Sequence, residues 1–142
     1  MTVIDTSFLL ALIDKADRWH NEAAGRPLHG DRLLIPWEIW IEFCNVLATR
    51  LASTDAREVM EAIASGPFDI RHVLTVEDTV EILNDLEDVR KRMEGDRIPS
   101  VLTFFDLVVC RLAQRFKEGI LTFDQGIVRA VKASLFPGAR IA

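Results

Sequence analysis

Acidic residues stand at the carboxyl ends of two apolar runs in this sequence. Asp5 closes the run at residues 2–5, and Asp124 follows the run at residues 120–123. Each run has the short apolar pattern of a buried strand, and a helical pattern comes after it. Ligands of open parallel sheets bind in the crevice outside the carboxyl ends of the strands. Hydroxyl side chains accompany both carboxylates: Thr6, Ser7 and Thr122. This combination indicates a metal or phosphate site.

Two further acids fall within apolar helical patterns. Asp106 shares a predicted helix face with Val109 and Cys110, three and four positions later. Glu42 shares a face with Ile39 in the same way. A carboxylate beside a core must be paired, hydrogen-bonded or bound to a metal, because leaving it unsatisfied costs several kcal/mol. The sequence therefore offers four candidate functional acids.

Each of these acids also has a purely structural interpretation. Asp5 and Asp124 are well suited to cap the helices that follow them, since Asp is favoured at that position. Asp106 is a candidate cap of its own helix, and Glu42 is within reach of Arg50 on the same predicted helix. The sequence leaves these alternatives open for each acid alone, and the set of four together favours a functional site.

The elements that must position these acids alternate between strand and helix along the chain. An acidic capping pattern, Thr75-Val76-Glu77-Asp78, opens one of the helices, and Gly119 is a plausible stop for another. This alternation predicts one domain over residues 1–142, a three-layer α/β/α sandwich with a mainly parallel central sheet. The predicted strands are residues 2–5, 32–36, 68–74, 120–123 and 139–141. The predicted helices are residues 8–13, 19–24, 37–51, 54–65, 75–94, 104–117 and 125–133, with a loop at 25–31.

Composition narrows the classes of function. The 142 residues carry a net charge of −5, which argues against a module that grips nucleic acid through its own basic surface. Divalent cations in an acidic site supply the positive charge that phosphates need. No apolar run approaches the length of about 20 residues that crosses a bilayer. Cys44 and Cys110 are isolated and are expected to be buried, reduced thiols, so we expect a cytoplasmic protein.

The order of the four acids resembles that of the PIN-domain ribonucleases, and most closely that of the VapC-type toxins of toxin–antitoxin pairs. The resemblance covers essentially the whole chain. The helix of the third acid runs through Leu107, Val108 and Val109, where the family usually has small residues. The matching segments are Val-Ile-Asp5-Thr6-Ser7, Trp-Ile-Glu42-Phe-Cys-Asn-Val-Leu, Phe-Phe-Asp106-Leu-Val-Val-Cys-Arg-Leu-Ala and Leu-Thr122-Phe-Asp124.

The resemblance implies a metal-dependent endoribonuclease that hydrolyses RNA phosphodiester bonds. Oxygen-only carboxylate ligands suit Mg²⁺ or Mn²⁺, and no Cys/His cluster points to zinc. The implied partners are an RNA substrate, a cognate antitoxin protein and a second copy of the chain. The implied catalytic and metal-binding residues are Asp5, Glu42, Asp106 and Asp124, with supporting hydrogen bonds from Thr6, Ser7 and Thr122.

Other classes of protein that place Asp at strand ends fit this sequence less well. A haloacid-dehalogenase-like phosphatase needs a second Asp two positions after the first, where this chain has Ser7. A receiver domain needs a central phosphate-accepting Asp and a later strand-end Lys, and neither has a place here. Two alternatives within the fold stay open: a PIN-domain nuclease of RNA processing and a catalytically silent PIN-fold binding domain.

Two surface features have two interpretations each. The basic run at residues 90–92 either contacts RNA phosphates or, as its acidic neighbours favour, forms ion pairs on a solvated helix face. Those neighbours are Glu87, Asp88 and Glu94. Trp37 and Trp40 lie on one side of a predicted helix, where they belong either to the core or to a partner surface.

Overall fold

A five-stranded parallel sheet forms the centre of the computed structural model, which describes residues 1–28, 30, 32–98 and 101–142. The strand order is β3-β2-β1-β4-β5, and every neighbouring pair is parallel. The predicted parallel α/β architecture is confirmed. The strands are β1 (Thr2–Ile4), β2 (Leu33–Pro36), β3 (Phe68–Arg71), β4 (Gly119–Leu121) and β5 (Arg140–Ile141).

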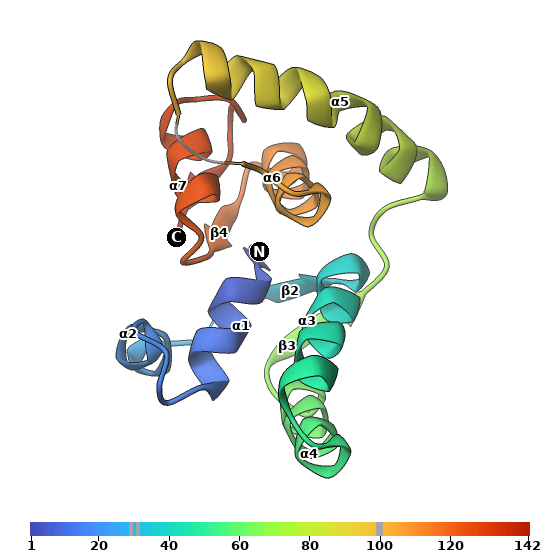
Figure 1. Ribbon diagram of the computed structural model, residues 1–142, viewed down its shortest axis with the longest axis vertical. Helices are drawn as coiled ribbons and strands as arrows, with labels where there is room; N and C mark the ends of the chain where they lie inside the picture. The colour runs from blue at the N-terminus through green and yellow to red at the C-terminus, as the bar shows by residue number, and fades with distance from the viewer. Residues whose placement is uncertain (29, 31, 99–100) are drawn as a thin grey trace.

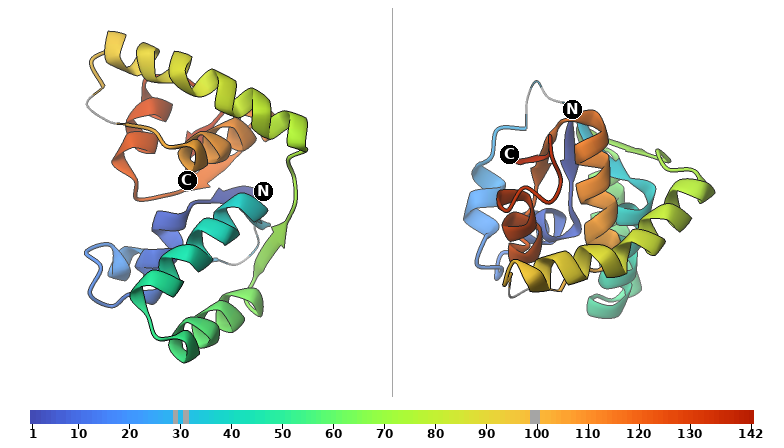
Figure 2. Two further views of the ribbon diagram at one scale, coloured as in Figure 1. Left: turned by 45° about the vertical axis from the view of Figure 1, so that its right-hand side comes forward. Right: turned by 90° about the horizontal axis from the view of Figure 1, so that it is seen from above.

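Helices cover both faces of the sheet (Figure 1). The left view of Figure 2 shows α1–α4 on one side of the strands and α5–α7 on the other. This division follows from right-handed crossovers, because the chain moves outward in one direction from β1 to β3 and then returns past β1 to β4 and β5. The helices are α1 (Thr6–Ile13), α2 (His20–Gly25), α3 (Trp37–Arg50), α4 (Ser53–Ala64), α5 (Val76–Gly95), α6 (Phe104–Phe116) and α7 (Gln125–Lys132).

Local capping chemistry explains where the helices near the sheet edge begin. Asp5 and Asp124 cap α1 and α7 with their side chains. The predicted capping box of α5 is present, with Thr75 and Asp78 bonded reciprocally. Helix α6 begins with the same device, formed by Thr103 and Asp106. The structural interpretation of Asp5 and Asp124 as N-caps is therefore correct, whereas Thr103 is the N-cap of α6 and Asp106 completes its capping box. These structural roles leave room for a second one.

Three details differ from the sequence-based expectations. The strand predicted at 68–74 pairs only as far as Arg71, because β2 ends opposite that residue. Helix α6 ends at Lys117, which adopts φ 55°, so Gly119 is not the stop but the first residue of β4. A side chain at Gly119 would have a Cβ 3.0 Å from the Cβ of Ala142, which explains the glycine. Cys44 is half-buried, whereas Cys110 is buried as expected.

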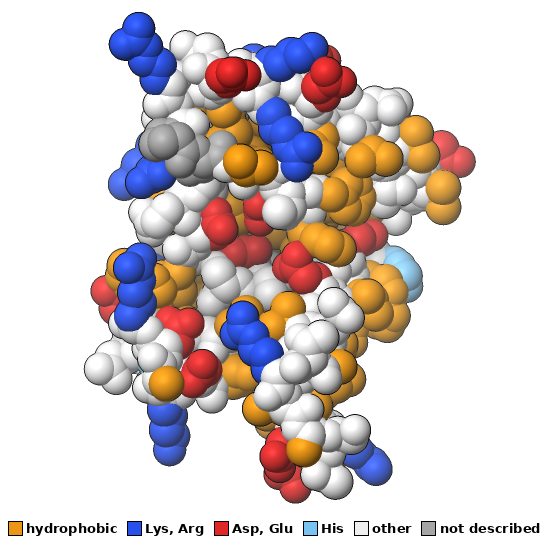
Figure 3. All heavy atoms as spheres, viewed as in Figure 1, with side chains coloured by type: hydrophobic (Ala, Val, Ile, Leu, Met, Phe, Trp, Pro, Cys, Tyr) orange, Lys and Arg blue, Asp and Glu red, His pale blue; other side chains and the backbone are white. Residues whose placement is uncertain are grey.

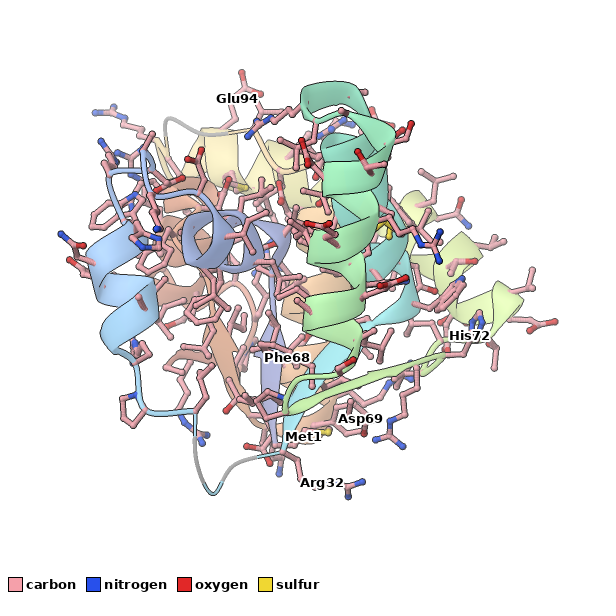
Figure 4. All side chains as sticks on the ribbon, turned by 90° about the horizontal axis from the view of Figure 1, so that it is seen from below. Met1, Arg32, Phe68, Asp69, His72 and Glu94 are labelled. Carbon is pink, nitrogen blue, oxygen red and sulfur yellow. The ribbon has the colours of Figure 1, made fainter. Side chains whose placement is uncertain are left out.

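The expected pairing of the basic run is correct only in part. Lys91 pairs with Glu87 at 3.2 Å, whereas Arg90 donates to a backbone carbonyl instead. The expected loop at 25–31 includes His29 and Asp31, which lie outside the described residues. Charged side chains also tie the amino-end edge of the sheet, where Asp69 lies 3.1 Å from Arg71 and 3.8 Å from Arg32 (Figure 4).

Apolar side chains on both faces of the sheet make the core. Strand β1 is central, and its Val3 and Ile4 are fully buried. Phe8 of α1 and Phe43 of α3 are among the largest buried side chains on one face, and Met93 of α5 is among those on the other. Within the described part of the chain, no helix is long and apolar enough to cross a membrane.

Phe43→Ala should destabilise the protein strongly. Phe43 is 0% exposed, so truncation removes buried area and leaves a cavity, which typically costs about 3–5 kcal/mol. Asn45→Ala, on the same helix but exposed, should change the free energy of unfolding by less than about 0.5 kcal/mol. Urea unfolding followed by circular dichroism measures the free energy of unfolding of both variants. Equal losses in the two variants would contradict this account of the core.

Candidate active site

The four candidate acids converge on one recess at the carboxyl edge of the sheet. They come from four elements: the ends of β1 and β4, helix α3 and the first turn of α6. The recess has a volume of about 310 Å³. Figure 3 shows acidic side chains gathered in a hollow in the middle of one face. Its lining residues are Asp5, Thr6, Ser7, Leu10, Glu42, Val46, Val101, Thr103, Asp106 and Asp124.

Strand pairing brings the two strand-end acids together. Strands β1 and β4 are neighbours in the sheet, with Ile4 opposite Leu121. The amide of Asp5 continues this pairing and donates to the carbonyl of Leu121 at 3.0 Å. The residues that follow the two strands therefore leave the sheet at the same edge, which places Asp5 beside Thr122 although they are 117 positions apart.

Hydroxyl groups hold the Asp5 carboxylate. Oδ2 of Asp5 accepts hydrogen bonds from Oγ of Ser7 at 2.5 Å and from Oγ1 of Thr122 at 2.8 Å. The amide of Ser7 adds a longer bond at 3.3 Å. Burial raises the pKa of Asp5; these hydrogen bonds oppose the rise, and the charge of Asp124 adds to it. Oδ1 has no donor among the described residues, so one oxygen stays available for a cation.

Ser7 and Thr122 lie against one another, and each donates its single hydroxyl proton to Asp5. Their hydroxyl oxygens lie 3.1 Å apart. Oγ of Ser7 also accepts from the amide of Phe123 at 2.9 Å, and Oγ1 of Thr122 accepts from the amide of Asp124 at 3.0 Å. These contacts give both hydroxyls a structural task. They link the start of α1 to the start of α7 across the sheet edge.

Glu42 reaches the recess from α3, where Oγ1 of Thr6 donates a short hydrogen bond to its Oε1. The pKa of Glu42 is raised, first by burial and then by the charges of Asp5 and Asp124, while the Thr6 bond lowers it. The suggested pairing of Glu42 with Arg50 is wrong, since no ion pair joins them among the described residues. Glu42 points to the acids instead.

Asp106 has two roles because it occupies the third position of α6. Its Oδ2 accepts from the amide of Thr103 at 2.7 Å, and its own amide donates to Oγ1 of Thr103 at 3.2 Å. Burial raises the pKa of Asp106 to about 7, and the charges of Asp124 and Asp5 add to the rise. Asp124 has a similar double position, because its Oδ1 caps α7 by accepting from the amide of Ile127 at 3.0 Å.

Neutral donors, not cations, satisfy all four carboxylates. Within the described residues, none of the ion pairs with Lys or Arg includes any of these acids. The described Asp, Glu, His and Cys side chains do not form a ready cluster of three that could hold a metal ion. The acids instead line the recess, and the pKa values of three of them are raised, first by burial and then by the like charges of their neighbours. Oxygen donors of this kind suit a hard divalent cation such as Mg²⁺ or Mn²⁺.

Thr103 and Val101 line the recess although the sequence did not single them out. The spacing of Thr103 and Asp106 is the same as that of Thr75 and Asp78, so the capping pattern was a usable signal for Thr103. Val101 carried no such signal. Its place depends on how the segment before α6 crosses the sheet edge.

Comparisons with known proteins agree with this fold. A family model described as the PIN domain matches residues 2–133, which is most of the chain. The chain therefore belongs to the PIN domain family. A comparison with curated proteins gave no match.

Solved structures similar to this chain include two VapC-type proteins. One is VapC20 of Mycobacterium tuberculosis, described as a toxin that cleaves the sarcin–ricin loop, with TM-score 0.62 and 18% identity over 97% of this chain and 98% of that chain. The other is VapBC2 of Rickettsia felis bound to a DNA fragment of its promoter, with TM-score 0.66 and 11% identity over 99% and 96% of the two chains. At these identities the likeness concerns the fold.

Asp106 should make the metal-free protein less stable as the pH rises. Its pKa is about 7 in the folded protein against 3.8 for an ordinary Asp. Between these values the unfolded chain has released a proton that the folded protein still holds. The free energy of unfolding therefore falls as pH rises from about 4 to about 7 and then levels off. Asp106→Asn should reduce this fall in urea unfolding curves recorded with EDTA.

Asp78→Asn provides the matched control, because Asp78 occupies the same capping position in α5. The pKa of Asp78 is lowered, first by its hydrogen bond with Arg115. The stability that ionised Asp78 contributes is therefore lost as the pH falls, which is the opposite of the pH dependence expected from Asp106. The Asp78→Asn variant should keep the fall between pH 4 and 7. If the free energy of unfolding depended on pH identically in Asp106→Asn and in the parent protein, the raised pKa assigned to Asp106 would be contradicted.

Proposed function

We propose that this protein is a metal-dependent endoribonuclease that hydrolyses RNA phosphodiester bonds. The observation that carries the proposal is the convergence of four carboxylates on one open recess, where no ion pair among the described residues joins any of them to Lys or Arg. Asp5, Asp106 and Asp124 would hold Mg²⁺ or Mn²⁺ directly or through water, and Glu42 would assist. Membership of the PIN domain family supports this assignment.

The side chains of the recess have different roles. A bound divalent cation supplies an activated water and offsets negative charge on the phosphate and on the leaving oxygen. Ser7 and Thr122 fix the orientation of Asp5 by donating to its Oδ2. Thr6 fixes Glu42 in the same manner. The open recess admits a nucleic-acid backbone, whose phosphates meet the acids only when a cation lies between them.

Ser7 is not proposed as a nucleophile. Its hydroxyl donates to Asp5 and accepts from the amide of Phe123, so both of its polar functions are used. No His lines the recess among the described residues, and a serine nucleophile needs a neighbouring base. Hydrolysis by water is the reaction that the donor set favours.

We further propose that the protein is the toxin of a toxin–antitoxin pair and acts in the cytoplasm. The folds of VapC20 and of the VapBC2 complex support this role. A PIN-domain nuclease of RNA processing and a silent binding domain are the alternatives. A small reading frame next to this gene, whose product binds the protein and suppresses cleavage, separates the toxin from the processing nuclease. Retention of all four acids argues against the silent domain.

Replacing an acid of the recess should abolish cleavage without unfolding the protein. Asp5→Asn keeps a good capping residue for α1 but removes a charged oxygen ligand. We expect Mg²⁺-dependent cleavage of a panel of structured RNAs to fall by at least about a hundredfold in this variant, because ligand loss exceeds the effect of losing an outer partner. Labelled RNA fragments on denaturing gels provide the measurement, with Mn²⁺ and EDTA as parallel conditions.

Asp78→Asn is again the control, since Asp78 caps a helix but lies outside the recess. It should retain cleavage. Full metal-dependent activity in Asp5→Asn would exclude the site assignment. A parent protein that cuts no RNA of the panel with either metal would favour the silent binding domain.

A homodimer is part of the proposal, and an exposed apolar surface supports it. Val76, Val80 and Leu83 of α5 are spaced along one side of the helix, and all three are more than half exposed. Trp37 and Ile41 of α3 are also exposed. Figure 3 shows apolar side chains gathered over the start of α5 and of α3 at one edge of the molecule. Exposed apolar groups of this extent are typical of a protein–protein interface.

The double variant Val80→Glu/Leu83→Glu should convert a dimer to a monomer, because two buried charges per chain would face a like surface. Size-exclusion chromatography with light scattering measures the mass. Phe116→Glu, at an exposed apolar position at the end of α6, should leave the dimer intact. A monomeric parent protein, or a dimer unaffected by the double change, would contradict this interface.

A further inference from the structure

A second hollow adjoins the acidic recess and contains a basic residue. It has a volume of about 280 Å³ and is lined by Arg90, Glu94, Ile98 and Val101. Val101 lines both this hollow and the acidic recess, so the two share a wall. Figure 4 shows Glu94 at the end of the molecule toward which the strands run, the same end as the acids.

Arg90 is anchored by the backbone of that wall. Its Nε and Nη2 donate to the carbonyl of Leu102 at 2.9 and 2.8 Å. Leu102 is fully buried and precedes Thr103, whose amide binds Asp106. The guanidinium is therefore tied to the segment that also places an acid of the recess. Its Nη1 takes no part in this anchor.

The charge of Arg90 has no acidic partner among the described residues. Two neighbouring cations differ, since Lys91 of α5 pairs with Glu87 and Arg115 of α6 pairs with Asp78. Glu94 lines the same hollow, but it forms no ion pair with Arg90 among the described residues. An exposed guanidinium with a fixed orientation and a nitrogen outside its anchor is suited to bind a phosphate group. Because two of its N–H groups are already fixed, less conformational entropy is lost when a ligand binds.

Val101 adds an apolar contact at the same place. It is 76% exposed, although it lies on the wall between the acids and Arg90. Ile98, on the other side of the hollow, is half-buried. Figure 3 shows a basic and an apolar side chain together on the rim above the acids. Apolar surface beside a phosphate-binding group suits one nucleotide, which carries a flat base next to its phosphate.

We propose that this hollow is a nucleotide subsite of the RNA-binding surface. Arg90 binds a phosphate next to the one that is cleaved, and Val101 and Ile98 contact the base of that nucleotide. The inference rests on the proposed function, since it takes RNA as the ligand. It also explains how an acidic protein of net charge −5 holds a polyanion, because an anchored cation borders the acids.

The test measures RNA binding separately from cleavage. A fluorescein-labelled single-stranded RNA of mixed sequence is titrated in Ca²⁺, at several salt concentrations, and followed by fluorescence anisotropy. Arg90→Met should weaken binding about tenfold, the value of one charge-assisted contact. It should also reduce the slope of log affinity against log salt by about 0.7, as expected when one phosphate contact to a single strand is lost.

Three companion variants identify the cause of any loss of RNA affinity. Arg92→Met removes the same charge from α5 outside the hollow and should change neither quantity. Arg90→Lys should keep the salt slope but bind more weakly than the parent, because lysine cannot make the same fork of hydrogen bonds. Val101→Ser should weaken binding about fivefold with an unchanged slope, since an apolar contact releases no counterions.

The outcomes separate this inference from the proposed function. Equal RNA affinity and equal salt slope in Arg90→Met and Arg92→Met would overturn the subsite, whether or not the parent protein cleaves RNA. A parent protein that does not bind the RNA would also overturn it. A parent that binds through Arg90 but cleaves no RNA with Mg²⁺ or Mn²⁺ would keep the subsite and overturn the hydrolase. Urea unfolding of Arg90→Met and Arg90→Lys establishes that both variants are folded under the binding conditions.

Discussion

Burial of like-charged carboxylates in one recess is the constraint on which the rest of the site depends. Asp5, Glu42 and Asp106 all have raised pKa values, and the neighbouring acids contribute to each rise. Burial is the larger cause in every case, so the fold holds these groups where their ionised forms are disfavoured. The divalent cation that we propose would stabilise such a structure, because it would bind the folded protein and not the unfolded chain.

The way the carboxylates are held keeps their charge available to the cation that we propose for the recess. Lysine or arginine partners would neutralise the acids and compete with a metal. Hydroxyl and amide donors from Thr6, Ser7, Thr103 and Thr122 orient the acids without removing their charge. Three cations of α5 and α6 pair with other acids, and Arg90 donates to a carbonyl. Positive charge thus borders the recess without entering it.

The residues that cap the helices are also those that we propose as metal ligands, which links the fold to the proposed site. Asp5, Asp106 and Asp124 each bond to a backbone amide in the first turn of a helix or just before it. A carboxylate has two oxygens, so one can serve the helix while the other remains for a ligand. The helix starts therefore fix the direction of each acid, and a loss of the cap would disturb the site as well.

Much of this protein was predictable from its sequence, because the signals involved are local. The strands, most helix boundaries and the caps at Asp5 and Thr75 depend on residues within a few positions of each other. The strand at Phe68–Arg71 was overestimated, since its length is set by its neighbour β2 and not by its own pattern. Gly119 was misread for a similar reason, as the close approach of Ala142 is invisible in the local sequence.

Only the tertiary structure decided which side chains meet. Thr6 and Glu42 are 36 positions apart, and Thr122 and Asp5 are 117 apart, yet each pair is hydrogen-bonded. Strand order brings them together, because β1 lies between β2 and β4 and the carboxyl ends of all three open on one edge. The anchor of Arg90 at Leu102 depends likewise on how α5 crosses the start of α6. The sequence determined which residues can do chemistry, and the topology determined their partners, since contacts between distant residues follow from the packing of whole elements.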